Sequence, residues 1–171
     1  MNNVGKVIWI TGLSGSGKTT IASEVVKQFE DDGLKVCIID GDGIREAMGN
    51  DLGYHFDDRL KSAYRMSRLA NMLSQQGLNV VVATISLFKE IHDFNRSELK
   101  NYIEVYIESD IALLQSQNSK NIYTDCNVDE VVGLGLSYHL PDNPNLTINN
   151  TNREQGPVDI ACQIFQYAKR Y

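Results

Sequence analysis

The stretch Gly12-Leu13-Ser14-Gly15-Ser16-Gly17-Lys18-Thr19 matches the phosphate-binding pattern G-x-x-x-x-G-K-[ST] at every fixed position. In this pattern the glycines let backbone N–H groups turn toward a phosphate, the lysine meets the β- and γ-phosphates, and the final hydroxyl coordinates Mg²⁺. An apolar run at 7–10 precedes the stretch, and apolar side chains at helical spacing follow it over 20–30. Because strand, loop and helix come in the required order, the sequence predicts a nucleoside triphosphate site. A glycine-rich turn without a ligand is the alternative.

Four more apolar runs, at 36–39, 80–84, 103–107 and 146–148, are typical of buried strands. The segments between them are long enough for crossover helices, and such alternation indicates a parallel sheet covered on both faces. We therefore expect an α/β fold of the P-loop NTPase type, a nucleoside-kinase-like three-layer sandwich with a mostly parallel central sheet. Ligands of such sheets bind beyond the carboxyl ends of the strands, so the loops after the first three strands should meet at the site.

Several helix ends can be located from the sequence. Gly33 follows the first predicted helix, and Asp57 can cap a helix that runs to Gln76, with Gly77 just beyond it. The segment 154–170 has the apolar spacing of a closing amphipathic helix.

The composition is that of an ordinary globular domain, and 171 residues fit a single domain over 1–171. The formal net charge of −6 disfavours a nucleic-acid or anionic-membrane binder. No apolar run approaches the ~18 residues that span a bilayer, and the first residues lack the layout of a signal peptide, so we expect a cytoplasmic protein. The cysteines and histidines show no metal-ligand spacing, which favours structural roles for them.

Two carboxylates and a cation follow the second predicted strand, in the segment Asp40-Gly41-Asp42-Gly43-Ile44-Arg45. Beside a phosphate loop, a carboxylate can hold Mg²⁺ through water or accept the proton of an attacking hydroxyl, and an arginine can bind an anionic acceptor. A turn followed by a helix start is the simpler explanation of the same residues. The neighbouring phosphate loop favours the functional one, because phosphoryl transfer needs a carboxylate near the γ-phosphate.

Several separate motifs together resemble those of the adenosine 5′-phosphosulfate (APS) kinases, in that family's order. The matching residues are Trp9 to Thr20, which include the phosphate loop; Asp40-Gly41-Asp42 with Arg45; Leu52-Gly53-Tyr54 with Asp58-Arg59; Ile85-Ser86; and Tyr138, Pro141, Asn143-Pro144 and Leu146. The resemblance runs from about 7 to 148. It implies an ATP- and Mg²⁺-dependent kinase that phosphorylates the ribose 3′-hydroxyl of a nucleotide, usually as a homodimer.

The departures from the family pattern concentrate where APS kinases hold their acceptor. Gly43 and Ser62 stand in place of asparagines, Tyr64 in place of an arginine, Leu87 in place of a proline, and Val131 in place of one of the two aromatic residues that sandwich the acceptor adenine. In the lid segment 117–123, neutral amides replace an arginine and an aspartate. Loss of a base–aromatic stack costs about 1–3 kcal/mol of purine binding, whereas the phosphate-handling residues are all retained. The resemblance therefore implies a changed acceptor.

A pyrimidine nucleotide fits these departures, because its base needs less stacking area. The chain is most similar to the branch of the family that phosphorylates cytidine 5′-diphosphoramidate on its 3′-hydroxyl in capsular polysaccharide biosynthesis. Two alternatives stay open: an APS kinase of sulfate assimilation with altered lid chemistry, which makes 3′-phosphoadenosine 5′-phosphosulfate, and a regulator that binds ATP without transferring phosphate. The regulator is disfavoured by the joint retention of Lys18, Thr19, Asp40, Asp42 and Arg45.

The expected roles follow from the loop chemistry and from the resemblance. The residues from Gly12 to Thr20 bind ATP, with Lys18 at the β- and γ-phosphates. Thr19 and Asp40 hold Mg²⁺, and Asp40 and Asp42 orient the metal-bound water and the attacking hydroxyl, in either order. The acceptor-binding residues that the resemblance implies are Asp42, Arg45, Tyr54, Arg59, Ser62, Ile85, Ser86 and, on a mobile lid around 115–140, Lys120. The simpler alternatives are surface packing for Tyr54 and a solvated side chain for Lys120.

Overall fold

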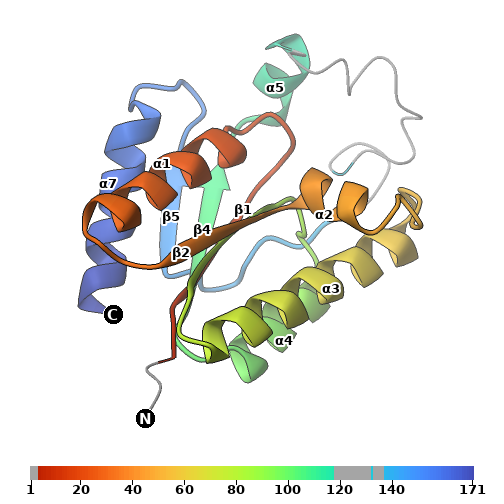
Figure 1. Ribbon diagram of the computed structural model, residues 1–171. Helices are drawn as coiled ribbons and strands as arrows, with labels where there is room; N and C mark the ends of the chain where they lie inside the picture. The colour runs from red at the N-terminus through yellow and green to blue at the C-terminus, as the bar shows by residue number, and fades with distance from the viewer. Residues whose placement is uncertain (1–3, 118–131, 133–136) are drawn as a thin grey trace.

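The computed structural model describes residues 4–117, 132 and 137–171 (Figure 1). The centre of the protein is a five-stranded sheet with the strand order β2-β3-β1-β4-β5, in which every pair of neighbours is parallel. The strands are β1 (Val7–Thr11), β2 (Val36–Asp40), β3 (Asn79–Thr84), β4 (Tyr102–Glu108) and β5 (Leu146–Asn149). All five predicted strands are therefore present, and the parallel sheet of the predicted fold class is confirmed.

Helices cover both faces of the sheet (Figure 1). On one face α1 (Lys18–Asp31) and α7 (Pro157–Arg170) pack together, whereas α3 (Phe56–Gln75) and α4 (Lys89–Glu98) cover the other. Two short helices, α2 (Gly41–Ala47) and α5 (Ile111–Gln117), lie at the carboxyl end of the strands. This is the three-layer arrangement that the alternation of strands and helices predicts.

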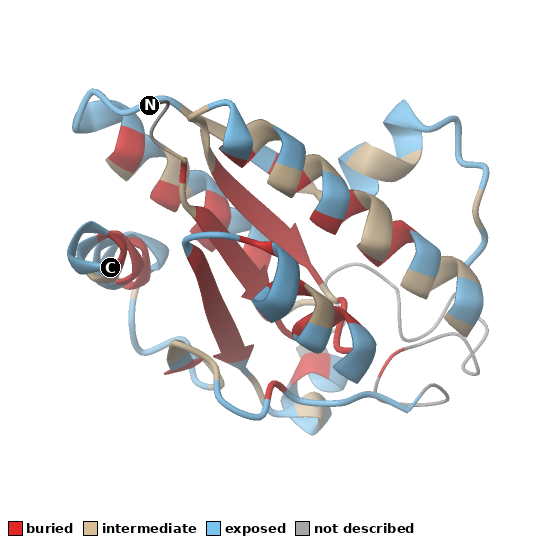
Figure 2. Cartoon of the chain, turned by 90° about the horizontal axis from the view of Figure 1, so that it is seen from below, coloured by how far each residue is buried: buried red, intermediate tan, exposed pale blue. Residues whose placement is uncertain are grey.

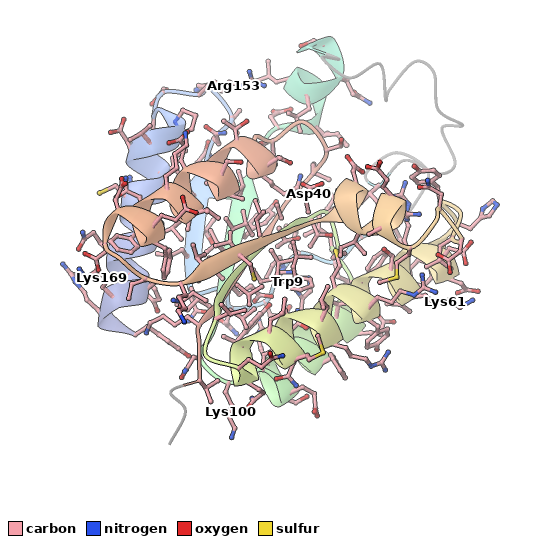
Figure 3. All side chains as sticks on the ribbon, viewed as in Figure 1. Trp9, Asp40, Lys61, Lys100, Arg153 and Lys169 are labelled. Atoms are coloured by element: carbon pink, nitrogen blue, oxygen red, sulfur yellow. The ribbon has the colours of Figure 1, made fainter. Side chains whose placement is uncertain are left out.

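The side chains of β1 show how the layers are held together. Figure 2 shows the central strands β3, β1 and β4 buried over most of their length and the helices buried on the side that faces the sheet. Ile8 and Ile10 point toward the α1/α7 face, where the rings of Phe29 and Phe165 meet edge to face at 5.0 Å. Trp9, in the middle of the molecule in Figure 3, points toward the α3/α4 face and has no exposed surface. Burial of each such side chain contributes about 1.5–3 kcal/mol, so the sheet is a rigid base for the loops at its carboxyl edge.

Most predicted helix ends agree with the structure. Gly33 and Gly77 follow the ends of α1 and α3, and their N–H groups donate to carbonyl oxygens of the last helical turn. The start of α3 was placed wrongly, because His55 takes the N-cap position and Asp57 lies in the first turn. The helix dipole favours a negative charge anywhere in the first turn of a helix. Asp57 therefore indicates that a helix starts nearby but does not identify the N-cap residue.

Some sequence predictions lie outside the described residues. Lys120 and Val131 lie there, as does most of the lid expected around 115–140, so their roles stay predictions. The division into one domain over 1–171 likewise stays a prediction. Within the ranges that are described, no helix is both long and apolar enough to cross a bilayer.

Candidate active site

The phosphate loop joins the end of β1 to the start of α1 and passes close to β4. At Gly12 an added Cβ would lie 2.5 Å from the carbonyl oxygen of Ile107, so the loop can approach the backbone of β4 only with a glycine at this position. Gly17, the N-cap of α1, has a φ of 93°, a left-handed conformation that glycine adopts without strain. This shape places backbone N–H groups at the N-terminus of α1, where a phosphate is stabilised.

Lys18 is the buried cation of the loop. Its Nζ atom donates hydrogen bonds to the carbonyl oxygen of Leu13 at 2.6 Å and to Oγ of Ser16 at 3.5 Å. A buried ammonium group needs oxygen acceptors, and ionised phosphate oxygens are stronger acceptors than a carbonyl or a hydroxyl. The lysine is therefore placed to exchange these loop oxygens for a phosphate.

Asp40 ends β2 beside the phosphate loop, and its two carboxylate oxygens have different partners. As the N-cap of α2, Oδ1 accepts hydrogen bonds from the backbone N–H groups of Asp42 at 3.0 Å and Gly43 at 3.4 Å. Oδ2 accepts a hydrogen bond from Oγ1 of Thr19 at 3.2 Å. Carboxylate and hydroxyl oxygens beside a phosphate site suit Mg²⁺, which binds through few protein oxygens together with phosphates and water. The pair fits the predicted metal site.

Asp42 lies in the first turn of α2, and its side chain lines the cavity of the site. Among the residues that the structure describes, its carboxylate has no hydrogen-bond or ion-pair partner, so it is available to accept a proton. Gly43 leaves the space next to Asp42 open, because a Cβ added there would meet nothing within 4 Å. Where the family pattern has an asparagine side chain, Gly43 therefore leaves open space.

The two arginines predicted to hold the acceptor both lie close to the ring of Tyr54. The Cζ atom of Arg45 is 4.5 Å from the centroid of the tyrosine ring, and that of Arg59 is 5.2 Å from it. Arg45 donates from Nη1 to the carbonyl oxygens of Leu52 and Gly53, both at 2.9 Å, and Arg59 donates from Nε to the Tyr54 carbonyl oxygen at 2.7 Å. A guanidinium carries five N–H donors, so Arg45 keeps donors for an anion after these bonds are made.

The inner wall of the acceptor side comes from α3 and from the residues after β3. Thr11 donates a hydrogen bond from Oγ1 to the carbonyl oxygen of Ile85 at 2.5 Å, which fixes this turn to the central strand. The hydroxyls of Thr84 and Ser86 are 2.7 Å apart, and Ser62 on α3 is buried against the same cavity. The wall therefore presents short hydroxyl side chains, and the serine at 62 leaves more room than the asparagine of the family pattern.

Two other positions of the family pattern have structural roles here. Tyr64 packs its ring edge-on against Phe94 at 5.1 Å, between α3 and α4, and is not among the residues that line the cavity. Arg65 forms a bidentate pair with Asp51, with N–O distances of 2.7 and 2.8 Å, and this hydrogen bonding lowers the pKa of Asp51. The pair ties the loop before Tyr54 to α3.

A cavity of about 1080 Å³ brings most of the predicted site residues together. It is lined by Ser14, Gly15, Gly17, Lys18, Thr19, Thr20, Asp40, Asp42, Arg45, Tyr54, Arg59, Ser62, Ile85 and Ser86. Three residues predicted to bind ATP, Gly12, Leu13 and Ser16, are not part of this lining and shape the loop from behind. The volume is slightly above the ~300–1,000 Å³ usual for one small ligand, as expected of a site for both a donor and an acceptor.

One wall of the cavity was missed by the sequence reasoning. Asn150, Arg153 and Gln155, from the loop after β5, line it on the side of α1. Asn150 donates from Nδ2 to the carbonyl oxygen of Ser16 at 2.9 Å, which attaches this loop to the phosphate loop. Arg153 and Asp40 lie at the same end of the molecule (Figure 3). The rule that ligands bind beyond strand ends applies to β5 as well, and applying it there would have found these residues.

A phosphate loop alone is compatible with hydrolysis of a nucleoside triphosphate as well as with transfer of its phosphoryl group to an acceptor. The other half of the cavity is informative, because arginines and hydroxyls line it next to the place of the γ-phosphate, where a second substrate would bind. Fold and site together define the chain as a P-loop phosphotransferase. A family model described as adenylylsulphate kinase matches residues 4–149, and the chain belongs to that family.

Three relatives show the range of similarity within the family. The chain is 39% identical to the cytidine diphosphoramidate kinase of Campylobacter jejuni over 90% of its length and 91% of the relative's. It is 34% identical to the adenylyl-sulfate kinase of Bacillus licheniformis over 95% of its length and 84% of that relative's. The APS kinase of Mycobacterium tuberculosis, solved in complex with AMPPNP and APS, matches with a TM-score of 0.86 and 26% identity, covering 96% of this chain and 98% of that one. The protein is an ATP-dependent kinase, as predicted.

Proposed function

We propose that the protein transfers the γ-phosphoryl group of ATP to the ribose 3′-hydroxyl of cytidine 5′-diphosphoramidate, in the biosynthesis of a capsular polysaccharide phosphoramidate. The observation that carries this proposal is Ser62, which is buried at the acceptor side of the cavity. Gly43, on the same helix as Asp42 but not itself part of the cavity lining, leaves the space beside it open. The family pattern has asparagine at both positions. The identity to a cytidine diphosphoramidate kinase, 39% against 34% for the adenylyl-sulfate kinase, supports the same acceptor.

In the proposed reaction, Lys18 and the N–H groups of the phosphate loop hold the β- and γ-phosphates of ATP in line with the acceptor. Asp42 accepts the proton of the 3′-hydroxyl as its oxygen bonds to the γ-phosphorus and the bond to the β-phosphate oxygen breaks. Arg45 and Arg59 bind the anionic 5′ end of the acceptor, and Tyr54 stacks on its base. The products are ADP and the 3′-phosphorylated nucleotide.

Mg²⁺ fits the oxygens of Thr19 and Asp40, which are 3.2 Å apart beside the phosphate loop. When bound, the ion supplies positive charge that stabilises the transferred phosphoryl group. Asp40 also fixes the start of α2 through the N–H groups of Asp42 and Gly43, and in this way holds Asp42 beside the phosphate loop.

The test is ³¹P NMR of the protein with Mg-ATP and, in separate samples, cytidine 5′-diphosphoramidate, CDP, CMP and APS. We expect a new 3′-phosphomonoester signal with cytidine 5′-diphosphoramidate, little with APS, and none when Lys18→Ala replaces the wild type. Preferential turnover of APS would overturn the proposed acceptor.

An adenylyl-sulfate kinase is the second candidate, because the residues that handle phosphate are all present and the Bacillus licheniformis relative covers 95% of the chain. A regulator that binds ATP without transfer is the third. It predicts no acceptor-dependent ADP formation in the wild type, whereas both kinase candidates predict turnover that Asp40→Ala and Asp42→Ala remove. We also expect a homodimer, to be measured by light scattering of the purified protein.

A further inference from the structure

A buried carboxylate, Glu104 on β4, is the centre of a polar cluster that the proposed reaction does not use. Only 1% of it is exposed. Its Oε1 accepts hydrogen bonds from Nδ1 of His92 at 2.7 Å and from the hydroxyl of Tyr102 at 3.0 Å, and its Oε2 accepts one from Arg96. Burial alone raises the pKa of Glu104, but the bond from His92 and the charges of His92 and Arg96 outweigh it and hold this pKa below its ordinary value. The carboxylate is therefore ionised.

The second ring nitrogen of His92 also faces an acceptor. Nε2 lies 3.3 Å from the carbonyl oxygen of His139, and the ring of His92 is 3% exposed. An ionised carboxylate and a carbonyl oxygen only accept hydrogen bonds, and a neutral imidazole has one N–H. The ring therefore satisfies both neighbours only when both nitrogens carry a proton.

The backbone of His139 connects this ring to the acceptor side of the cavity. The N–H group of His139 donates to the carbonyl oxygen of Leu87 at 2.9 Å. Leu87 is fully buried, and the residues on either side of it, Ser86 and Phe88, line the cavity. A continuous set of hydrogen bonds thus runs from Glu104 to the segment 85–88, which we call the acceptor wall.

We propose that His92, in its protonated form, is a positioning residue for the acceptor wall: it holds the backbone of His139 against Leu87, and the affinity for the acceptor falls when the ring loses its Nε2 proton. The proposal rests on the proposed function only for the choice of acceptor in the assay. It predicts a pH dependence of acceptor binding that is separate from the chemistry at Asp42.

Apart from the imidazole of His139, the other ionisable groups around the ring of His92 keep their charge in the neutral range. Those that face His92 are Glu104 and Tyr102 from β4, Arg96 and Asp93 from α4, and His139 from the segment 137–140. Burial and the charge of Glu104 raise the pKa of Tyr102 well above its ordinary value, and the hydrogen bond from Lys89 lowers the pKa of Asp93. Of the side chains around Glu104, only His92 and His139 carry an imidazole, the group whose charge ordinarily changes between about pH 5 and 8.

The experiment compares steady-state kinetics of the wild type, His92→Arg, His92→Gln and His139→Ala over this pH range, with cytidine 5′-diphosphoramidate or whichever nucleotide of the panel is phosphorylated. We expect the wild-type KM for the acceptor to rise about tenfold across the titration of one group, the size of one hydrogen bond to a charged partner. The KM for ATP should stay constant. His139→Ala is the matched control, because His139 contributes only backbone atoms, and it should keep the wild-type profile.

The two substitutions at His92 separate charge from packing. Arginine carries a permanent charge and several donors, so His92→Arg should give a low KM for the acceptor at every pH. Glutamine carries no charge, so His92→Gln should give a high KM for the acceptor at every pH. A flat wild-type profile, or a pH dependence that survives in His92→Arg, would overturn the proposal.

A second measurement does not depend on turnover or on the folding of a variant. In ¹⁵N NMR of the wild-type protein at about pH 5, the acid end of this range, we expect both ring nitrogens of His92 to be protonated. A ring with a single proton would overturn the proposal even if an acceptor is found. Protonation of both nitrogens combined with failure to phosphorylate any cytidine nucleotide would instead refute only the proposed acceptor.

Discussion

Replacing Asp40 by asparagine removes one negative charge from the junction of the phosphate loop and α2 while keeping the shape of the side chain. Asparagine can still cap α2 through its carbonyl oxygen, because asparagine and aspartate are equally good N-caps. The hydroxyl of Thr19, 3.2 Å from Oδ2 in the wild type, keeps a polar neighbour but loses a charged one. The substitution therefore tests the charge of Asp40 apart from its structural role.

The expected loss of Mg²⁺ affinity in Asp40→Asn follows from the position of Asp40. In the proposed site Asp40 would hold Mg²⁺ through water, as an outer partner beside the hydroxyl of Thr19. Loss of such a partner costs about 10- to 100-fold in metal affinity, or about 1.4–2.7 kcal/mol. Asp40→Ala additionally loses the two cap hydrogen bonds of 3.0 and 3.4 Å. That loss is worth about 1 kcal/mol of stability, or about 2–4 °C in Tm for a chain of this size.

The assay is ADP release at saturating acceptor with Mg²⁺ varied, together with thermal melts of both variants. Asp42→Asn is the matched control, since it removes the same charge two residues away; we expect it to lower kcat about 10²- to 10⁴-fold without changing the Mg²⁺ requirement. If Asp42→Asn shifts the Mg²⁺ requirement and Asp40→Asn does not, the two roles are exchanged. If Asp40→Asn melts as low as Asp40→Ala, the charge is structural and the reasoning is wrong.

Three further predictions concern the phosphate loop, the donor side and the buried carboxylate. Gly12→Ala should abolish ATP binding in calorimetry, because its Cβ would lie 2.5 Å from the Ile107 carbonyl oxygen. Arg153→Ala should raise the KM for ATP about tenfold, through loss of one charge-assisted contact, and leave the KM for the acceptor unchanged. Burial raises the pKa of Glu104, but its hydrogen bond to His92 and the nearby charges lower it below the ordinary 4.5. Its stabilising contribution is therefore present above about this pH and lost below it, so in acid the Tm of the wild type should fall more steeply than that of Glu104→Gln.

Each of these predictions has a control or an outcome that contradicts it. Gly43→Ala, where an added Cβ meets nothing within 4 Å, should keep ATP binding; normal ATP affinity of Gly12→Ala would mean that the loop can move away from β4. A raised acceptor KM in Arg153→Ala would place this arginine on the acceptor side. Parallel pH curves for the wild type and Glu104→Gln would show that the folded chain does not depend on that charge.

The phosphate loop and the segment from Asp40 to Arg45 could be predicted because their chemistry is local: the glycines, the lysine and the carboxylates lie within a few residues of a recognisable strand end. The parallel sheet followed from the same alternation of strands and helices. The strand order does not follow from local patterns. The place of Arg153 was missed for another reason: the expectation that the loops after the first three strands form the site leaves out the loop after the last strand.

His92 shows the same limit in the core. Its partners, Glu104 and the backbone of His139, are 12 and 47 residues away, so no local spacing reveals the cluster. A structural role was expected for this histidine, and its burial agrees with that expectation. The pair of acceptors on its two ring nitrogens arises only from tertiary structure.

The ribosome makes the phosphate loop before most of the residues that hold it in place. Both strands that pair with β1, at Asn79–Thr84 and Tyr102–Glu108, emerge later, and the face of α1 waits for α7 at the C-terminus. The side chain that ties the loop in place, Asn150, comes 134 residues after Ser16. Contacts of such sequence separation form slowly. The strand that leads into the phosphate loop therefore leaves the ribosome before either strand that pairs with it, and the loop gains its tie to Asn150 only after all five strands of the sheet have been made.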